Sequence, residues 1–210
     1  MEDANIQRIG VLGGTFNPVH AGHLILAQDA CELFDLQQVL FVPSAQPPHK
    51  PPGILLSIEH RMALLDLAVR DDPRFEVCDI EVARGGVSYT VDTAMLLRAR
   101  YPAAELCFIV GSDSLPELHL WRSIQQLLTL VRIVSLARPG FEEARVRALN
   151  LGLPAPWPER LLGDLRTGHL ADISSSDIRH RLAEGLSVRY LVSDAVAMYI
   201  AEHYLYTGGN

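Results

Sequence analysis

Two histidines one helical turn apart are the side chains of this sequence best suited to chemistry on a phosphate. His20 and His23 follow the segment Gly13-Gly14-Thr15-Phe16-Asn17-Pro18, which connects an apolar β-type run to a helix-period run. At a spacing of three residues both imidazoles project to one side of the first helical turn, and Gly22 between them leaves room for a ligand. Two surface histidines on an ordinary helix are the alternative.

The backbone around these histidines favours an anion as that ligand. Gly13 and Gly14 permit a tight turn and a close approach of the main chain to a phosphate, while Thr15 and the helix start provide hydrogen-bond donors. With the helix dipole, these groups would gather around one charge. Nucleotidyl transfer needs such an arrangement, because its transition state spreads charge over oxygen atoms.

A second candidate phosphate site is the segment Ile173-Ser174-Ser175-Ser176-Asp177-Ile178-Arg179. Ser175 and Ser176 at a helix start can donate to an anion, and Arg179 adds a fixed charge about one turn later. The plainer alternative is a serine N-cap followed by a solvated arginine.

Three further side chains allow two interpretations each. Asp113, shortly after the predicted strand that ends at Val110, can accept from a ribose hydroxyl or form a local turn. Trp121 lies in a polar-flanked stretch and can stack on a flat heterocycle or fill the core. Arg138, at the end of the last predicted strand, can contact nucleotide phosphates or remain a surface arginine.

The elements that must position these residues alternate along the chain. Short apolar runs predict strands at 9–12, 39–42, 75–82, 106–110 and 133–136. Helix-period segments predict helices at 21–34, 58–69, 91–101 and 124–130, the second of them capped by Ser57. This alternation predicts an α/β fold with a Rossmann-like, doubly wound parallel sheet, whose ligands bind at the carboxyl ends of the strands.

Two stretches are predicted to be irregular, and two helices follow them. Five prolines and the only lysine make residues 43–53 a loop at the carboxyl end of the second strand. Residues 150–160, with three prolines, are expected only to connect the sheet to helices capped by Ser175 and Ser193. We expect one domain over residues 1–210, with a small helical C-terminal subregion from about 173 to 210.

Composition narrows the class of protein. The chain is 49% hydrophobic and 20% charged, and its net charge of −7 without a basic cluster argues against a nucleic-acid partner. Cys31, Cys78 and Cys107 lie in apolar runs, which favours buried thiols in a reducing cytoplasm. The sequence lacks the pattern of a signal peptide and any run of 18 apolar residues, so we expect a cytoplasmic protein without a membrane partner. It leaves a homo-oligomer open.

The ordered set of motifs resembles the nucleotidyltransferase superfamily and, within it, the bacterial nicotinate-nucleotide adenylyltransferase family. Besides the H-x-G-H segment, four places match in order: Pro47-Pro48-His49-Lys50, Ser88-Tyr89-Thr90-Val91-Asp92-Thr93, Gly111-Ser112-Asp113-Ser114-Leu115 with Trp121, and Ile173 to Arg179. The resemblance implies transfer of AMP from ATP to nicotinate mononucleotide in NAD biosynthesis, with deamido-NAD and pyrophosphate as products. It also implies Mg²⁺ bound with ATP.

The resemblance further implies roles for individual residues, with His20 and His23 as the catalytic pair. The ATP-binding residues would be Gly13, Gly14, Thr15, Phe16, Gly111, Asp113, Ser175, Ser176 and Arg179. The mononucleotide-binding residues would be Ser44, His49, Lys50, Tyr89, Thr90, Trp121 and Arg138. Main-chain N–H groups around Tyr89, Thr90 and Trp121 would bond the pyridine carboxylate and so favour the acid over the amide. No spacing of the other histidines suggests a metal site.

Three positions depart from the family pattern or allow a second account. Ser44 stands where related sequences have Asn, which leaves a polar contact to the mononucleotide open. His49 and Lys50 can hold the substrate phosphate or simply belong to an exposed, flexible loop. Asn17 stands where Asp occurs in some members, which leaves Mg²⁺ to be held mainly by the triphosphate.

Other nucleotide-dependent classes fit less well. A nicotinamide-dependent dehydrogenase would need G-x-G-x-x-G after the first strand, where this chain has Gly13-Gly14, and a P-loop kinase would need G-K-[ST], where the only lysine follows His49. The remaining alternatives are another adenylyltransferase of the superfamily, using nicotinamide mononucleotide or pantetheine phosphate, and a non-catalytic nucleotide sensor. Such a sensor would be expected to lose one of the two motif histidines.

Overall fold

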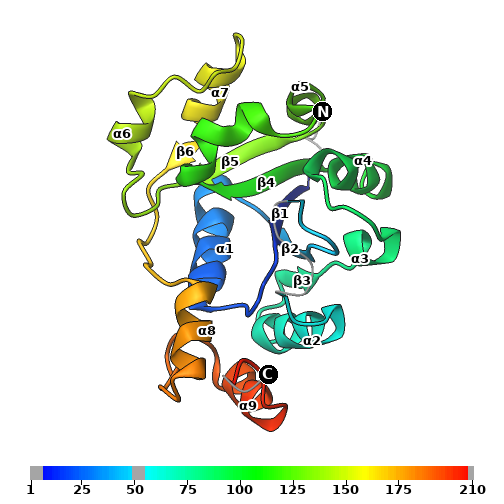
Figure 1. Cartoon of the computed structure of the whole chain (residues 1–210). Coiled ribbons are helices and arrows are strands. Elements are labelled where there is room, and N and C mark those ends of the chain that lie inside the picture. Colours follow the sequence, from blue (N-terminus) through cyan, green and yellow to red (C-terminus); the bar gives the residue numbers. More distant parts are fainter. Residues whose placement is uncertain (1–6, 49–54, 208–210) are drawn as a thin grey trace.

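A six-stranded parallel sheet forms the centre of the computed structural model, which describes residues 7–48 and 55–207 (Figure 1). The strands are β1 (Arg8–Gly14), β2 (Gln38–Pro43), β3 (Phe75–Val77), β4 (Glu105–Gly111), β5 (Arg132–Leu136) and β6 (Leu165–Arg166). Their order is β3-β2-β1-β4-β5-β6, so the winding reverses between β1 and β4. This confirms the predicted doubly wound Rossmann-like sheet and places the ligand edge at the carboxyl ends of β1 and β4.

Helices cover both faces of the sheet, and each face has its own hydrophobic cluster. One cluster contains residues of α1 (Ala21–Phe34), α2 (Ile58–Val69), α8 (Ser175–Ala183) and α9 (Asp194–Glu202). The other contains residues of α4 (Thr90–Arg100), the 3-10 helix η1 (Ser112–Leu120), α5 (Ile124–Leu130), α6 (Glu143–Arg147) and α7 (Trp157–Gly163). The central strands are therefore buried on both sides, as parallel sheets require.

Packing between the layers is close at the middle of β1. A Cβ atom on Gly10 would lie 2.8 Å from Leu36 Cδ1 and 3.0 Å from side-chain atoms of Ile109 and Val39. Glycine at this position therefore lets the loop after α1 pack closely against the sheet.

The predicted strand at 75–82 is wrong in its second half. β3 ends at Val77, and α3 (Ile80–Arg84) follows, with Asp79 at the N-cap position and Glu81 in the first turn. Alternating apolar residues in this stretch suggested a strand, but acidic residues at its start favour a helix. Gly85, with φ of 69°, then ends the helix in the left-handed region.

The expectation of an irregular segment at 150–160 is wrong in its last four residues, because α7 begins at Trp157. Pro156 occupies its N-cap position and Pro158 its first turn, where a missing N–H costs no intrahelical hydrogen bond. The two-residue strand β6 then pairs with β5 and is too short to show a periodicity.

The two predicted C-terminal helices are present, and one of their caps differs. Ser193 caps α9 as predicted, and its side chain accepts from the Val196 N–H. In α8 the cap is Ser174, whose Oγ accepts from the Asp177 N–H at 3.1 Å, rather than Ser175. Across the described residues, no helix has the length and apolar character needed to span a bilayer.

Candidate active site

The segment between β1 and α1, residues 15–20, is called the motif loop below. Gly13 and Gly14 still belong to β1, and the left-handed residue is Phe16, with φ of 45°. The sharp turn thus lies two residues later than the glycines that were predicted to make it. A Cβ on Gly13 would meet no atom within 4 Å, so the backbone there borders open space.

Phe16 was predicted to bind ATP, but its side chain belongs to the core. It is 1% exposed and packs against His23, with ring centroids 5.0 Å apart, and against Phe41. A Cβ on Gly14 would lie 3.1 Å from the Phe16 ring, so this glycine makes room for it. Phe16 therefore positions a histidine, and only its main chain can face a ligand.

The two motif histidines lie side by side, with ring centroids 3.7 Å apart. The His20 backbone N–H donates to His23 Nδ1 at 3.2 Å. Because a backbone N–H can only donate, His23 Nδ1 is unprotonated and its proton is on Nε2, which can donate to a ligand. His20 is buried, and its Nδ1 has no hydrogen-bond partner.

Both histidines are held neutral. Burial, and then the nearby charge of Arg138, lowers the pKa of His20 to about 4. Burial, followed by the charges of His20 and Arg138, lowers the pKa of His23 well below its usual value. At neutral pH the pair therefore offers hydrogen-bond donors without carrying positive charge, and an entering anion would favour protonation.

Arg138 follows β5 and lies on the histidine side of the site. Its backbone N–H donates to Ser112 Oγ at 2.9 Å, and its buried Nε has no partner. A Cβ on Gly111 would lie 2.8 Å from that Nε and would collide with Asp113 Oδ1, so Gly111 leaves space for both side chains. Arg138 does not line the cavities of Tyr89 and Trp121. Arg138 thus lies near the histidines rather than beside Tyr89 and Trp121, and its role in binding the mononucleotide stays a prediction.

The other predicted mononucleotide residues meet at two adjoining cavities, which share Ser88, Thr90 and Trp121. One, of about 250 Å³, is also lined by Gly13, Gly14, Thr15, Ser44 and Glu81. The other, of about 400 Å³, is also lined by Pro48, Tyr89, Leu120 and Arg122. A cleft thus runs from the end of β1 to Trp121. His49 and Lys50 lie outside the described residues.

Arg122 was not predicted, although it directly follows Trp121. Its guanidinium lies over the Tyr89 ring, 4.3 Å from the ring centroid, and lines the larger of the two cavities. The backbone N–H groups of Tyr89 and Trp121, in contrast, donate to Val87 O and Leu118 O. Two of the expected main-chain donors are therefore already engaged, and Arg122 supplies a positive charge instead.

The first turn of α8 is fastened to the motif loop. Ser175 Oγ donates to Pro18 O at 2.9 Å, and Arg179 donates through one Nη to Asn17 O at 2.7 Å and through the other to Ser176 Oγ at 3.2 Å. These residues were predicted to bind ATP phosphates. Their place beside the motif loop fits that role, and some of their donors also hold the loop.

Arg61 is a second residue that sequence reasoning missed. It is 2% exposed, and its Nη1 donates to Thr15 O at 3.0 Å and to Ser44 O at 2.8 Å, while its Nε donates to Leu56 O at 3.2 Å. The only signal in the sequence was a charged residue on the buried face of α2. Arg61 joins the motif loop to the segments at both ends of the proline-rich loop.

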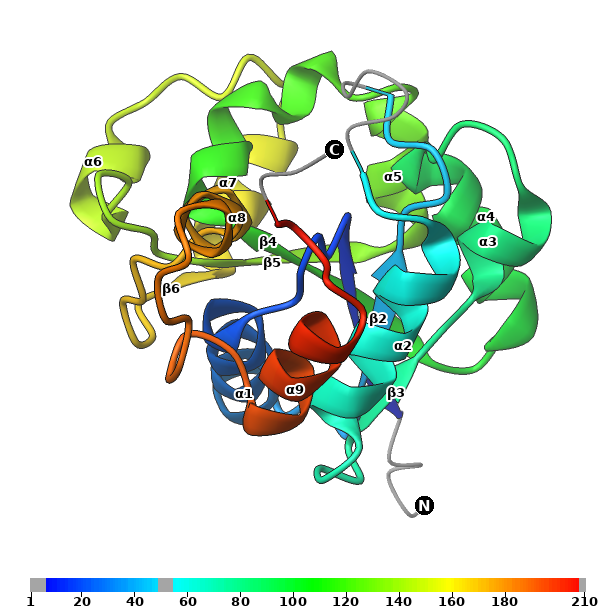
Figure 2. The same cartoon turned by 60° about the horizontal axis from the view of Figure 1, so that its bottom comes forward.

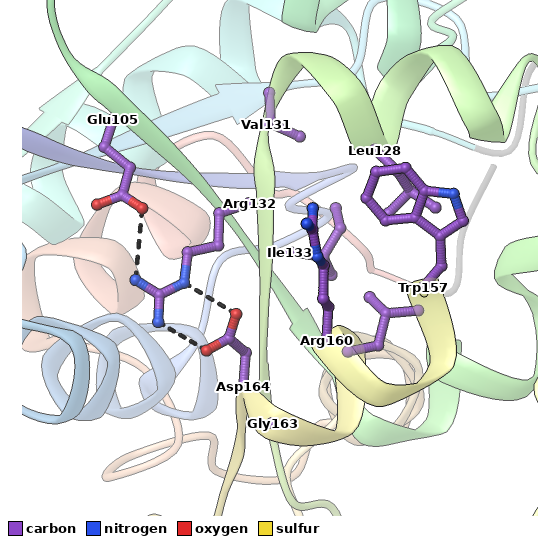
Figure 3. A pocket seen from close by; sticks show the side chains of 10 residues that line it. Glu105, Leu128, Val131, Arg132, Ile133, Trp157, Arg160, Gly163 and Asp164 are labelled. Carbon is purple, nitrogen blue, oxygen red and sulfur yellow. Dashed lines mark hydrogen bonds and ion pairs between the residues drawn. The ribbon is translucent and has the colours of Figure 1, made fainter. Parts of the chain in front are cut away.

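A further cavity lies elsewhere, at the amino ends of β4 and β5 (Figure 3). It measures about 440 Å³ and is lined by Trp157 and several aliphatic residues. Arg132 bonds Asp164 at 2.6 Å and Glu105 at 3.4 Å, so these three charged side chains are paired with one another. No buried side-chain atom without a partner, among the residues that the structure describes, lines this cavity.

Comparisons with known proteins show the family of the chain. A cytidylyltransferase-like family model matches residues 11–181. Proteins of Opitutus terrae and Citrifermentans bemidjiense, each described as a probable nicotinate-nucleotide adenylyltransferase, are 46% and 43% identical over 95% of this chain and 97% and 98% of their own.

Solved structures show the same fold at lower identity. The Plasmodium falciparum nicotinic acid mononucleotide adenylyltransferase complexed with NaAD covers 95% of this chain and 97% of its own, with a TM-score of 0.72 at 16% identity. The sequence relatives span nearly the whole chain at more than 40% identity. The chain therefore belongs to the nicotinate-nucleotide adenylyltransferase family of cytidylyltransferase-like proteins.

Proposed function

We propose that the protein transfers AMP from ATP to the 5′-phosphate of nicotinate mononucleotide, giving deamido-NAD and pyrophosphate. The observation that carries this proposal is that neutral His20 and His23 lie near Arg138 after β1. A cleft runs from Gly13, Gly14 and Thr15 at the end of the same strand to Trp121. A phosphate site thus adjoins a site for a flat ring.

The chemistry requires positioning and charge stabilisation more than proton transfer. An oxygen of the mononucleotide phosphate attacks the α-phosphorus of ATP, and the bond between that phosphorus and the bridging oxygen of the β-phosphate breaks. Pyrophosphate leaves with the electron pair. The nucleophile is already an anion, so no base is needed, and the N–H groups of His20, His23 and Arg138 stabilise the charge that develops.

The triphosphate would extend toward α8, where Ser176 and Arg179 stand next to the motif loop. Among the described residues no group of three His, Cys, Asp or Glu side chains could hold a metal ion by itself. We propose that Mg²⁺ enters bound to ATP and lies beside the triphosphate, with Asp113 following β4 at the same edge of the sheet. Bound there, Mg²⁺ would neutralise charge on the pyrophosphate.

The pyridine ring would stack on Trp121, with its carboxylate near Thr90 and Arg122. Thr90 begins α4, and the first N–H groups of a helix have no partner within it. Donors and a cation match both oxygens of an acid but leave the NH₂ of an amide facing donors, a mismatch that costs about 1–3 kcal/mol when buried. The site should therefore prefer nicotinate over nicotinamide mononucleotide by roughly one to two orders of magnitude.

The test is a measurement of kcat/KM for each of the two mononucleotides with ATP and Mg²⁺, in an assay that monitors the release of pyrophosphate. Arg122→Ala should lower the preference for the acid. Arg100→Ala is the matched control, because Arg100 also lies over a tyrosine ring but at the other end of α4. A ratio near one, or favouring the amide, would overturn the substrate assignment. Release of pyrophosphate only with pantetheine phosphate, or with no acceptor, would overturn the proposed function.

We also propose a cytoplasmic location. All three cysteines are buried and unpaired, as thiols in a reducing compartment would be. Detection of the protein in a soluble extract with its thiols free to react only after denaturation would support this, and a disulfide in the purified protein would contradict it.

A further inference from the structure

The side chain of Asn17 in the motif loop is completely buried and holds together two segments that are distant in sequence. Its Oδ1 accepts from the Leu56 N–H at 3.2 Å and from the Tyr206 hydroxyl at 2.8 Å. Because a backbone N–H can only donate, the atom facing Leu56 must be the carbonyl oxygen of the amide. The Tyr206 hydroxyl is therefore a donor in this contact.

Tyr206 lies in the segment that follows α9, and Figure 2 shows this segment, in red, passing the blue residues that follow β1. Burial raises the pKa of the Tyr206 phenol, while the charges of Arg179 and Arg61 act in the opposite direction. The hydroxyl thus stays protonated near two arginines that also hold the motif loop.

These contacts join the regions proposed for the two substrates. Leu56 follows the proline-rich stretch 43–53 in the sequence, and Arg61 binds its carbonyl as well as those of Thr15 and Ser44. Arg179, on the side proposed for ATP, binds the carbonyl of Asn17. Asn17 therefore stands between the loop that borders the mononucleotide cavity and the arginine proposed for the triphosphate.

We propose that Tyr206 is a positioning residue that couples the two substrate sites through Asn17. This inference rests on the proposed places of ATP and the mononucleotide. With the hydroxyl present, the Asn17 amide has two donors on Oδ1 and one orientation. Without it, only the Leu56 N–H holds Oδ1, the amide is held less firmly, and order in one substrate site is transmitted less to the other.

The experiment compares Tyr206→Phe with Tyr204→Phe. Tyr204 is two residues away and 80% exposed, so it is a matched control for the loss of one phenol oxygen. Calorimetry would measure the affinity for nicotinate mononucleotide with and without a non-hydrolysable ATP analogue and Mg²⁺. We expect the analogue to tighten binding about fivefold to tenfold in the wild type and in Tyr204→Phe, and less than about twofold in Tyr206→Phe.

Thermal melting and turnover complete the test. Tyr206→Phe keeps the ring, so its melting temperature should stay within a few degrees of the wild type, while kcat falls about fivefold to tenfold. Equal coupling in Tyr206→Phe and the wild type, or no coupling in the wild type, would overturn the inference. Failure of the wild type to release pyrophosphate would instead overturn the proposed function, so the two failures can be told apart.

Discussion

The two edges of the sheet differ in how their polar groups are satisfied. The amino edge has the larger cavity, about 440 Å³, but its Arg132 is bonded to both Asp164 and Glu105 (Figure 3). The carboxyl edge has smaller cavities, of about 250 and 400 Å³. Yet four of the five buried side-chain atoms without a partner in the described chain lie there, on Asn17, His20, Glu81 and Arg138.

We infer from this difference that unpaired buried polar atoms mark a ligand site better than cavity volume does. A buried donor without a partner costs about 1–3 kcal/mol, and a fold keeps that cost where a ligand removes it. Charged side chains that already have partners, such as Arg132, carry no such cost. Changes at the carboxyl edge should therefore alter rates, and changes at the amino edge should alter stability.

The largest effect is expected at the histidines. His20→Ala or His23→Ala should lower kcat about 10²-fold or more, because each removes a donor that stabilises transition-state charge. His180→Ala, an exposed histidine on α8, is the control and should keep full activity. Steady-state kinetics together with a melting curve would check this. Wild-type turnover in a folded His20→Ala variant would contradict the expectation that changes at the carboxyl edge of the sheet alter the rate.

A smaller effect, on the KM for ATP, is expected at α8. Arg179→Ala should raise KM for ATP about tenfold and that for the mononucleotide much less, because its proposed partners are ATP phosphates. Arg181→Ala is the control, since Arg181 lies on the same helix and donates to Ser187 O instead. Equal losses for both substrates would show that Arg179 acts only through the Asn17 carbonyl.

At the amino edge the effect should be on stability alone. Asp164→Asn weakens the bonds to Arg132, and we expect a loss of about 1–2 kcal/mol in the free energy of unfolding, with kcat unchanged. Asp71→Asn, in an exposed ion pair with Arg70, should change little. Urea unfolding and turnover would be measured on the same samples. A fall in kcat without a fall in stability would assign a function to the amino-edge cavity.

The smallest effect is a dependence of stability on pH. The folded protein keeps His20 neutral down to about pH 4, whereas an unfolded histidine takes up a proton below about 6.5. The unfolded state therefore binds more protons between these values, so stability falls as the pH drops from 6.5 toward 4. Between pH 7 and about pH 5.5 we expect His20 to account for about 1 kcal/mol. His20→Gln should flatten the dependence, and an unchanged slope would contradict the burial argument.

Local signals in the sequence predicted the parts of the fold that depend on neighbouring residues. Helices α1 and α2 occupy the predicted residues, since apolar periodicity and the Ser57 cap are local. The strand ending at Val77 and the helix starting at Trp157 were missed in part, because short elements carry weak periodicity and prolines suit the first helical turn.

The site shows the same limit. The motif predicted where His20 and His23 would lie, and the order of strands brought Trp121 to the same edge. Arg61 and Tyr206 carry no motif, and their contacts with the motif loop span 46 and 189 residues. Only the folded chain could reveal such pairs, because sequence patterns report the spacing of neighbours rather than contacts across the sheet.

The contact between Asn17 and Tyr206 can form only late in the synthesis of the chain. A ribosome adds about 5–20 residues per second, so the 189 positions between them take roughly 10–40 s to make. During that interval a nascent chain can have its nucleotide motif outside the ribosome while the hydroxyl that orients it has not been made. A growing chain would thus lack this contact until the segment after α9 has been made and has docked.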